Sequence, residues 1–544
     1  MGWFRVALQN GHRIMRAFPL TERFFPVLIL VCMLLPARRA AADAGLLRSP
    51  KPRGKTRIVY IADANSDTRS VLPDRPTAAH LRGYVDDLAL GGVDIYGQDV
   101  FQKQGVGWFW PEHPDHAHFA GPVDNIDRSD GPPIKIVIER CHQRGMKFLA
   151  VFRMADRHGG GQQGLIAKRE DLWNPDFGDA AMDYTHDAIR DWVFALIEEV
   201  LRRFDVDGIE FTYTRWMHCF PRAAARDSHP IMTRFLDRVR NKLDAVGTAK
   251  GRRLLLGVRV PQTLKECHAL GYDIPTWVER ELVDYVSPCD FFYTDFNASY
   301  EEFAALTRKS DCKLYPAVHP VTCRGDNIGI LGPRNYRAAA RNMYAAGADG
   351  ISQFNYQYHF GRRRGGYPWP EGNYPAALTW LRQLRGTGAF DGFPRHYLFL
   401  PLWAVDSPSG FAKNDRIVLK RAQGDSGSYR FRVAEDLRQG GVRAELIVRA
   451  AHVTEGDRLS FAINGKAIPS GEIKTIFHRQ GRPASYGRPL GPHRSFMIGL
   501  TSELIRFGDN RLQVTVAQPA GEGADEIVID ELEVTVVPPA TNVR

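Results

Sequence analysis

The sequence predicts a (β/α)₈ TIM barrel followed by a C-terminal all-β sandwich. Between residues 57 and 385, short apolar runs typical of buried strands alternate with amphipathic runs typical of helices, and the unit occurs eight times. Eight is the number of strands that closes such a barrel. Past residue 395 the pattern changes to short alternating runs separated by turn residues, which is typical of a sandwich.

The stretch around Glu210 shows the barrel unit most clearly. Residues 184–204 are amphipathic over a helix length, and an apolar, β-branched and aromatic run follows with Glu210 at its centre. Polar and aromatic residues come next and predict a loop. Since the carboxyl end of each barrel strand faces the active site, Glu210 is expected there. Strand alternation places Thr212 and Thr214 on the same side as Glu210.

The remaining units follow the same order, strand and then helix. Thr77 has the residue type and position of a helix N-cap. The other predicted strands are 57–65, 93–101, 146–154, 253–261, 283–292, 313–320 and 350–360. The predicted helices are 77–91, 134–144, 184–204, 231–246, 275–281, 300–308, 334–346 and 376–385.

The predicted domains are a barrel over residues 56–395 and a β-sandwich over residues 396–544. Asn464-Gly465 is a strong hairpin signal because both residues tolerate a positive φ. The expected sandwich strands are 416–420, 428–433, 442–449, 459–463, 511–516 and 526–537.

Residues 1–42 have the pattern of an export signal, and residues 43–55 that of a linker. Arginines precede an apolar run from Phe24 to Pro36, and small residues end at Ala42. Cleavage after Ala42 or Ala44 fits the small-x-small rule. We therefore expect an exported protein, periplasmic or extracellular. The alternative is an uncleaved membrane anchor, but the apolar run is short for a membrane span.

The composition is that of a globular protein and argues against a nucleic-acid-binding one. The chain of 544 residues is 44% hydrophobic and 25% charged, as in ordinary globular proteins. Its formal charge is +10, of which six arginines and one glutamate in residues 1–42 supply +5. The remaining positive charge is spread along the chain, so no nucleic-acid partner is expected.

The cysteines predict neither a zinc site nor a disulfide framework. No CxxC pair occurs, so we expect no metal and no other cofactor. Cys219 and Cys267 would lie in neighbouring loops, where a disulfide and two free buried thiols are both open. Cys312 and Cys323 bracket a predicted strand and are expected to lie too far apart to pair.

Polar and aromatic residues gather at the predicted carboxyl ends of the strands. Flat rings beside hydrogen-bonding groups suit sugar rings, whose faces are apolar and whose edges carry hydroxyls. The expected binding residues are Asp63, Asp99, Trp108, Trp110, Arg153, Arg215, Trp216, Arg259, His319, Asn355 and Tyr356.

Glu210 is the predicted proton donor for cleavage of a glycosidic bond. Such a reaction usually uses a second carboxyl group, about 5–5.5 Å away for retention and about 6.5–9.5 Å for inversion. Asp290 is the first candidate, and Asp99 and Asp63 follow. The alternative is a structural Glu210 paired with an arginine. The arginines at the mouth suggest an acidic or sulfated sugar.

Residues 57–390 resemble the glycosyl-hydrolase-like barrels of bacterial exported proteins, which are related to glycoside hydrolase family 10 and to chitinase-like barrels. The resemblance rests on residues 206–216, in which Asp-Gly-Ile leads to Glu210 and then to Arg215-Trp216, and on residues 283–288. It implies the barrel fold and a carbohydrate substrate. The sequence departs from the family pattern at Thr212, Thr214 and His319, where related enzymes carry acids.

Two other functions remain open at this point. The first is a carbohydrate-binding barrel without catalysis, in keeping with the missing acids at positions 212 and 214. The second is a metal-assisted barrel hydrolase that uses His319, His359 and the aspartates.

Overall fold

The structure, a computed structural model, describes residues 50–63, 71–73, 75–157, 164–177, 181–214, 216–290, 294–320, 331–361, 373–400, 402–403, 413–485, 488–521 and 525–539. The expected signal, residues 1–42, lies outside the described residues, as do most of the expected linker, Arg215 and Cys323. The described residues belong to one unit of the chain, residues 47–544. Among them, no helix has the length and apolar character that a membrane crossing requires.

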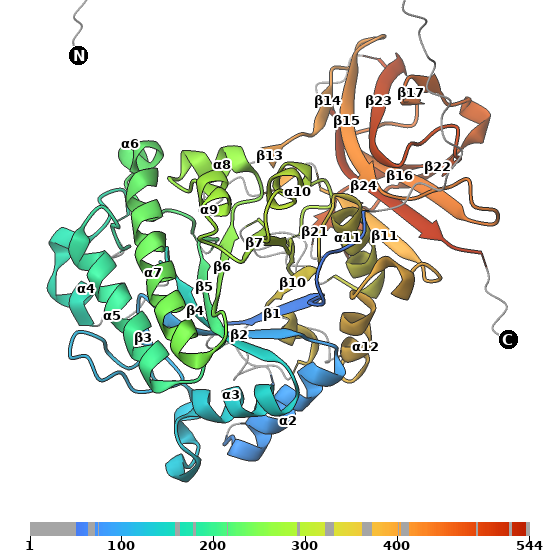
Figure 1. Cartoon of the computed structure of the whole chain (residues 1–544). Coiled ribbons are helices and arrows are strands. Elements are labelled where there is room, and N and C mark those ends of the chain that lie inside the picture. Colours follow the sequence, from blue (N-terminus) through green and yellow to red (C-terminus); the bar gives the residue numbers. More distant parts are fainter. Residues whose placement is uncertain are drawn as a thin grey trace, which may run out of the picture. The chain divides into compact units, whose positions relative to one another are not determined.

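The predicted (β/α)₈ barrel is confirmed. Parallel strands follow one another around the sheet in the order β8-β7-β6-β5-β4-β2-β1-β10-β9 (Figure 1). Only β3 (Gly105–Val106), a short strand antiparallel to β2, lies off this path. The strands of the path are β1 (Ile58–Ala62), β2 (Ile95–Gln102), β4 (Lys147–Arg153), β5 (Gly208–Thr212), β6 (Leu255–Val260), β7 (Tyr285–Pro288), β8 (Lys313–Leu314), β9 (Ala317–Val318) and β10 (Ile351–Phe354).

The seventh strand position is divided by Pro316. β8 pairs with β7 and β9 pairs with β10, and only two residues separate β8 from β9. Proline has no N–H to donate, so the ladder is interrupted there. Two bonds bridge the gap, from Tyr315 N to Val286 O and from Ser352 N to Pro316 O, both 2.9 Å. The nine described parallel strands therefore fill eight positions of a closed ring.

The helices cover the outer face of the sheet and leave the inner face to a small separate core (Figure 1). Outward side chains such as Ile58 and Tyr60 pack in the large core beneath the helices, whereas Val59 and Ile61 point into the barrel. Thr77 caps its helix as predicted. The longer helices are α2 (Ala78–Leu90), α3 (Pro133–Gln143), α5 (Asp187–Arg203), α7 (His229–Lys250), α10 (Glu301–Thr307), α11 (Pro333–Ala345) and α12 (Ala376–Gln383).

The other described barrel helices are short. They are α4 (Gly164–Lys168), α6 (Arg222–Ala225), α8 (Leu264–Ala269) and α9 (Ile274–Glu279).

The C-terminal part is an antiparallel sandwich, as predicted. One sheet contains β11 (Arg395–Phe399), β14 (Ile417–Leu419), β16 (Arg443–Ala451), β19 (Ile473–His478), β22 (His493–Leu500) and β24 (Ile527–Val537). The other contains β15 (Ser426–Val433), β17 (Arg458–Ile463), β18 (Lys466–Ala467) and β23 (Gly508–Gln518). Asn464 and Gly465 join β17 to β18 with φ values of 53° and 82°, which confirms the predicted hairpin.

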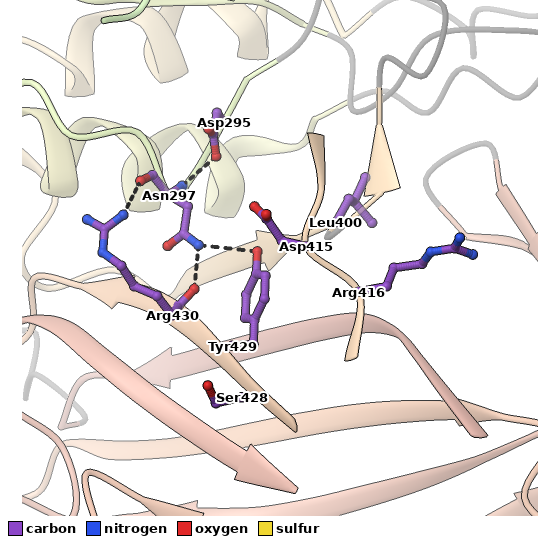
Figure 2. Close-up of a pocket in the computed structure, with 8 residues that line it drawn as sticks. All are labelled: Asp295, Asn297, Leu400, Asp415, Arg416, Ser428, Tyr429 and Arg430. Carbon is purple, nitrogen blue, oxygen red and sulfur yellow. Dashed lines mark hydrogen bonds between the residues drawn. The ribbon is translucent and has the colours of Figure 1, made fainter. Parts of the chain in front are cut away.

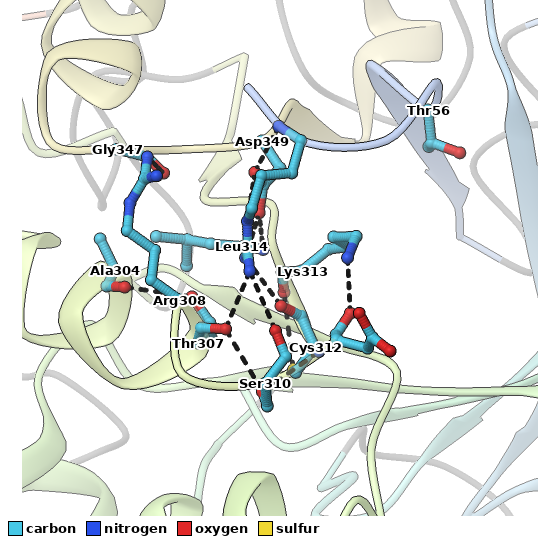
Figure 3. Close-up of polar contacts among 12 residues, drawn as sticks. Thr56, Ala304, Thr307, Arg308, Ser310, Cys312, Lys313, Leu314, Gly347 and Asp349 are labelled. Atoms are coloured by element: carbon cyan, nitrogen blue, oxygen red, sulfur yellow. Dashed lines mark hydrogen bonds and ion pairs between the residues drawn. The ribbon is translucent and has the colours of Figure 1, made fainter. Parts of the chain in front are cut away.

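Arg53, which the sequence assigns to a linker, is bound to the amino-terminal end of the barrel. Its Nε and Nη2 donate to the two carboxylate oxygens of Asp349, at 3.0 and 2.7 Å. Its guanidinium also donates to the backbone carbonyls of Thr307, Ser310 and Cys312, acceptors that Figure 3 shows close together. Because Asp349 is fully buried, Arg53 neutralises a charge that has no access to solvent.

Replacement of Arg53 by alanine is expected to lower the free energy of unfolding by roughly 3 kcal/mol, because it leaves the buried Asp349 carboxylate without its cation. Urea unfolding followed by circular dichroism measures the change. Lys51→Ala, an exposed cation of the same segment, is the matched control and should unfold like the wild type. An Arg53→Ala protein as stable as this control would contradict the assigned role.

Candidate active site at the barrel mouth

The interior of the barrel changes from apolar to charged toward the carboxyl ends of the strands. Its apolar core holds Val59, Ile61, Leu149 and Val151, among others. The strand register places Asp99, Val151, Glu210, Gly257 and Tyr285 at one level.

The next level toward the mouth carries Arg153, Thr212, Arg259 and Ser287. Charged side chains of four neighbouring strands, β2, β4, β5 and β6, therefore occupy two adjacent levels of the barrel interior.

Glu210 is fully buried and accepts hydrogen bonds at both carboxylate oxygens. The hydroxyl of Tyr285 donates to Oε2 at 2.5 Å. Thr212 Oγ1 and Arg259 Nε donate to Oε1 at 3.3 and 3.4 Å. An ionised carboxylate is an acceptor only, so this set of donors suits the charged form of Glu210. The predicted pairing of Glu210 with an arginine is thus present, through Arg259.

Tyr285 reaches Glu210 from β7 by passing over Gly257 of β6. A Cβ atom at position 257 would lie 2.0 Å from Cζ of the Tyr285 ring, so only glycine leaves room for it. Burial, and then the nearby charge of Glu210, raise the pKa of the Tyr285 hydroxyl, which therefore stays a hydrogen-bond donor.

Arg153 binds two carboxylates from the neighbouring strand ends. Its Nε donates to Asp99 Oδ2 at 2.6 Å, and its Nη2 lies 2.9 Å from Asp63 Oδ2. The Arg153 side chain is 1% exposed, so this cluster lies within the barrel and not on its rim. One guanidinium from β4 therefore joins Asp99 of β2 with Asp63, the residue that follows β1.

Asp99 is the acid of this site whose protonation changes near neutral pH. Burial raises the pKa of its carboxyl to about 7. The charge of Arg153 lowers this pKa, and the neighbouring charge of Asp63 raises it. A carboxyl group with such a pKa is able to give or take a proton at neutral pH.

Arg259 connects Asp99 with Glu210. Its charge acts on the Asp99 carboxyl, and its Nε pairs with Glu210 at 3.4 Å. Arg259 Nη2 donates to Ser352 Oγ at 3.3 Å, and the guanidinium carbon lies 4.6 Å from the centre of the Phe354 ring. The two acids thus lie in the field of one fixed cation.

Asp290 and His319 lie at neighbouring strand ends. Cys289, which directly precedes Asp290, is buried, and its Sγ lies 3.5 Å from Thr214 Oγ1. Asp290 is half-buried and acts electrostatically on Cys289 and on Tyr300 of the outer core. The backbone of His319 exchanges two 3.0 Å hydrogen bonds with Thr294 Oγ1. The catalytic role of Asp290 and the binding role of His319 stay predictions.

The structure does not place Trp108 and Trp110, two of the predicted sugar-binding residues, as open ring faces at the mouth. Trp108 is 2% exposed and belongs to the hydrophobic core, so a sugar has no access to its faces. Trp110 stacks on His118, and its carbonyl accepts a 2.7 Å hydrogen bond from Arg203 at the end of α5. The end of α5 leads into the amino end of β5, which is opposite to the mouth.

The remaining aromatic and amide candidates are also engaged within the protein. Tyr356 is fully buried in the outer core, and its hydroxyl donates to Ala377 O at 2.8 Å, so it does not face a substrate. Asn355 is buried in the left-handed conformation and accepts from Gln357 Nε2 at 3.2 Å. Trp216, in the loop after β5, is half-buried and packs against the core.

Sequence reasoning missed the contact of Tyr285 with Glu210 and the burial of Lys103. Strand alternation predicts that the side chain of Tyr285 points into the barrel. It does not predict that this side chain crosses over Gly257 to reach Glu210. Lys103 is buried in the hairpin after β2, and its backbone N–H donates to Asp156 Oδ2 at 3.1 Å. No residue pattern predicts a buried lysine at that turn.

Neither a metal cluster nor a disulfide is found in the described part of the chain. Within these residues, no group of three or more histidine, cysteine, aspartate or glutamate side chains could hold a metal ion. Cys219 and Cys267 are free buried thiols, so the disulfide alternative for this pair is wrong.

No protein-family model matches this sequence, and no curated protein matches it. Similar solved structures include a noncanonic maltogenic alpha-amylase from Thermotoga neapolitana, 11% identical, with a TM-score of 0.38 and coverage of 84% of this chain and 98% of that one. An alpha-L-fucosidase from Vibrio sp. strain EJY3 is 11% identical, with a TM-score of 0.37 and coverages of 89% and 97%.

A GH18 chitinase from Pseudoalteromonas aurantia is 14% identical, with a TM-score of 0.31 and coverages of 54% and 93%. These proteins are glycoside hydrolases by name. Similarity at this level carries no argument about the activity of the present chain, which has to come from its own site.

The buried Asp99 carboxyl is expected to make the stability of the protein depend on pH. Its pKa is about 7 in the fold and near 3.8 in an unfolded chain. Between about pH 4 and 7 the native state holds a proton that the unfolded state has released, so the free energy of unfolding falls as the pH rises.

Asp99→Asn removes this component, and the stability of the variant relative to the wild type should rise from pH 4.5 to pH 7.5. Urea unfolding at both pH values measures it. Asp311→Asn, an exposed aspartate, is the matched control. Parallel pH profiles for the wild type and Asp99→Asn would refute the assignment.

Proposed function

We propose that this protein hydrolyses a glycosidic bond at the mouth of its barrel. The observation that supports the proposal is the pair Asp99 and Glu210, two buried carboxyl groups at one level of the barrel interior in different environments. Glycoside hydrolysis uses two carboxyl groups of which one is protonated and the other charged, and unequal surroundings keep their protonation states apart.

The roles that the geometry favours differ from those predicted first. Glu210 accepts from Tyr285, Thr212 and Arg259, an arrangement that suits the charged carboxylate. Asp99, with its pKa raised by burial to about 7, suits the proton donor. We therefore propose Asp99 as the acid and Glu210 as the charged partner. The earlier assignment, with Glu210 as the acid and Asp290 as the second carboxylate, is the alternative.

We further propose a neutral sugar as substrate. An acidic or sulfated sugar was suggested by the arginines of the mouth. Both described arginines of the site are already bound by acids of the chain, Arg153 by Asp63 and Asp99, and Arg259 by Glu210. A guanidinium that is neutralised in this way has little attraction left for a sulfate or carboxylate of the ligand.

Substitution of either acid is expected to reduce turnover by about 100-fold or more, the usual contribution of one acid–base group. The measurement is release of reducing ends from a panel of neutral, uronic and sulfated polysaccharides by Asp99→Asn, Glu210→Gln and the control Asp311→Asn. If Asp99 is the donor, the wild-type kcat/KM should fall as the pH rises through about 7, where the donor loses its proton. Full activity of a folded Glu210→Gln protein would contradict the proposal.

A second candidate function is carbohydrate binding without catalysis. It is favoured by the complete burial of Glu210 and by its three protein donors, which leave a substrate no obvious access to this carboxylate. The same panel separates the two functions, because a binding protein retains a glycan without releasing reducing ends. In that case Glu210→Gln changes only the stability of the protein.

We also propose that the protein is exported, on the strength of the pattern in residues 1–42. Expression of the full chain in a Gram-negative host, followed by mass spectrometry of the periplasmic fraction, is expected to give a mature chain beginning at Asp43 or Gly45. An intact amino terminus on protein retained in the membrane fraction would instead support the uncleaved anchor.

A further inference from the structure

A cavity of about 430 Å³ lies beside the barrel mouth, between the segment that follows β7 and the sandwich. Asp295 and Asn297 line it from the barrel, and Asp415, Ser428, Tyr429 and Arg430 line it from β15 and from the turn before β14 (Figure 2). None of the residues predicted as site residues lines this cavity. Its volume falls in the range of small-ligand sites.

The two walls of the cavity are joined by hydrogen bonds. Asn297 Nδ2 donates to the Tyr429 hydroxyl at 3.2 Å and to Arg430 O at 2.5 Å (Figure 2). Arg430 in turn donates to Asn297 O at 3.2 Å and to Ser299 Oγ at 2.7 Å. A ligand that enters does not have to bring the walls together, so little conformational entropy is lost on binding.

A second set of bonds, behind the cavity, holds the same two parts of the chain. Asn342 of α11 donates through Nδ2 to Phe296 O and to Arg432 O, both at 2.9 Å. Its Oδ1 accepts from Ala434 N at 3.0 Å. One buried amide therefore joins the barrel segment to the end of β15 from three sides, and the cavity has a fixed frame.

The lining is mainly polar, with equal numbers of acidic and basic side chains and one apolar residue. The carboxylates of Asp295 and Asp415 are matched by the guanidinium groups of Arg416 and Arg430, which leaves no net charge. The Ser428 and Tyr429 hydroxyls and the Asn297 amide are also present, and Leu400 adds an apolar surface. Closely spaced donors and acceptors beside an apolar patch suit a ligand with many hydroxyls and no charge.

The cavity is connected to the barrel mouth through Asp295. Its Oδ2 accepts from Gln262 Nε2 at 3.1 Å, and Gln262 lies two residues past the carboxyl end of β6. Its Oδ1 accepts from Asn297 N at 2.7 Å. One acid thus links a residue near the end of β6 with a wall of the cavity.

We propose that this cavity is a second saccharide site, which binds a neutral part of the glycan outside the bond that is cleaved. The proposal rests on the proposed function in taking a glycan as ligand. Binding at this site does not require catalysis at the mouth, and the two are therefore tested separately.

The test uses the full mature chain in a Glu210→Gln background, so that a ligand is not consumed. A glycan array of neutral, uronic and sulfated oligosaccharides identifies the ligand, and titration calorimetry with the strongest neutral oligosaccharide gives Kd. Ser428→Trp fills the cavity from an exposed strand position. Ser460→Trp, an exposed serine of β17 in the same sheet, is the matched control.

We expect Ser428→Trp to weaken binding of the neutral oligosaccharide at least tenfold and Ser460→Trp to leave it unchanged, with equal thermal unfolding of both variants. Asp415→Asn, a smaller change at the same cavity, should weaken binding in the same direction. Wild-type affinity in Ser428→Trp, or binding of anionic glycans alone, or of none, overturns the proposal. Binding at this site without any release of reducing ends by the wild type would overturn the proposed hydrolysis and leave the second site standing.

Discussion

The rest of the barrel interior depends on the buried guanidinium of Arg153, which contacts Asp99 of β2 and Asp63, the residue after β1. Burying a charge costs several kcal/mol unless a partner compensates it. Asp63, 2.9 Å from the guanidinium, compensates the charge of Arg153. Asp99, whose pKa burial raises to about 7, accepts a 2.6 Å hydrogen bond from the same guanidinium, so one side chain joins three strands. A register shift of one residue in any of them would turn a charge toward the apolar outer core.

A second buried arginine, Arg259, pairs with Glu210 in the other half of the interior. The charge of Arg259 also acts on Asp99. The side chains proposed here for catalysis are therefore also the side chains that join neighbouring strands. Such a site resists stepwise change, because removal of one member leaves its partner buried and alone. The proposed catalytic role and the stability of the fold make opposite demands on Glu210, since access of a substrate to its carboxylate would weaken the bonds that keep it in place.

The sequence predicts the order of the elements well, because strand and helix periodicities are local properties. It predicts contacts poorly where they depend on neighbours distant in sequence. Tyr285 reaches Glu210 only across Gly257, and neither residue signals the other. Trp110 was expected at the mouth because it follows a strand, yet the long loop after β2 turns back toward the carboxyl end of α5. Tyr356 was expected to face a ligand, but β10 ends at Phe354 and the chain then turns outward.

Division of the seventh strand by Pro316 makes the circumference of the barrel uneven. Elsewhere the ring is continuous in its backbone ladder, but here its closure depends on two-residue strands and single bridging bonds. Closer to the mouth, past the end of β9, Thr294 Oγ1 exchanges two hydrogen bonds with the backbone of His319 and so links the segment after β7 to the end of the divided strand. Thr294 also precedes the wall of the second cavity. The segment that completes the ring near the mouth and the segment that lines the cavity are therefore one stretch of chain, held in place by side-chain hydrogen bonds and not by the backbone ladder.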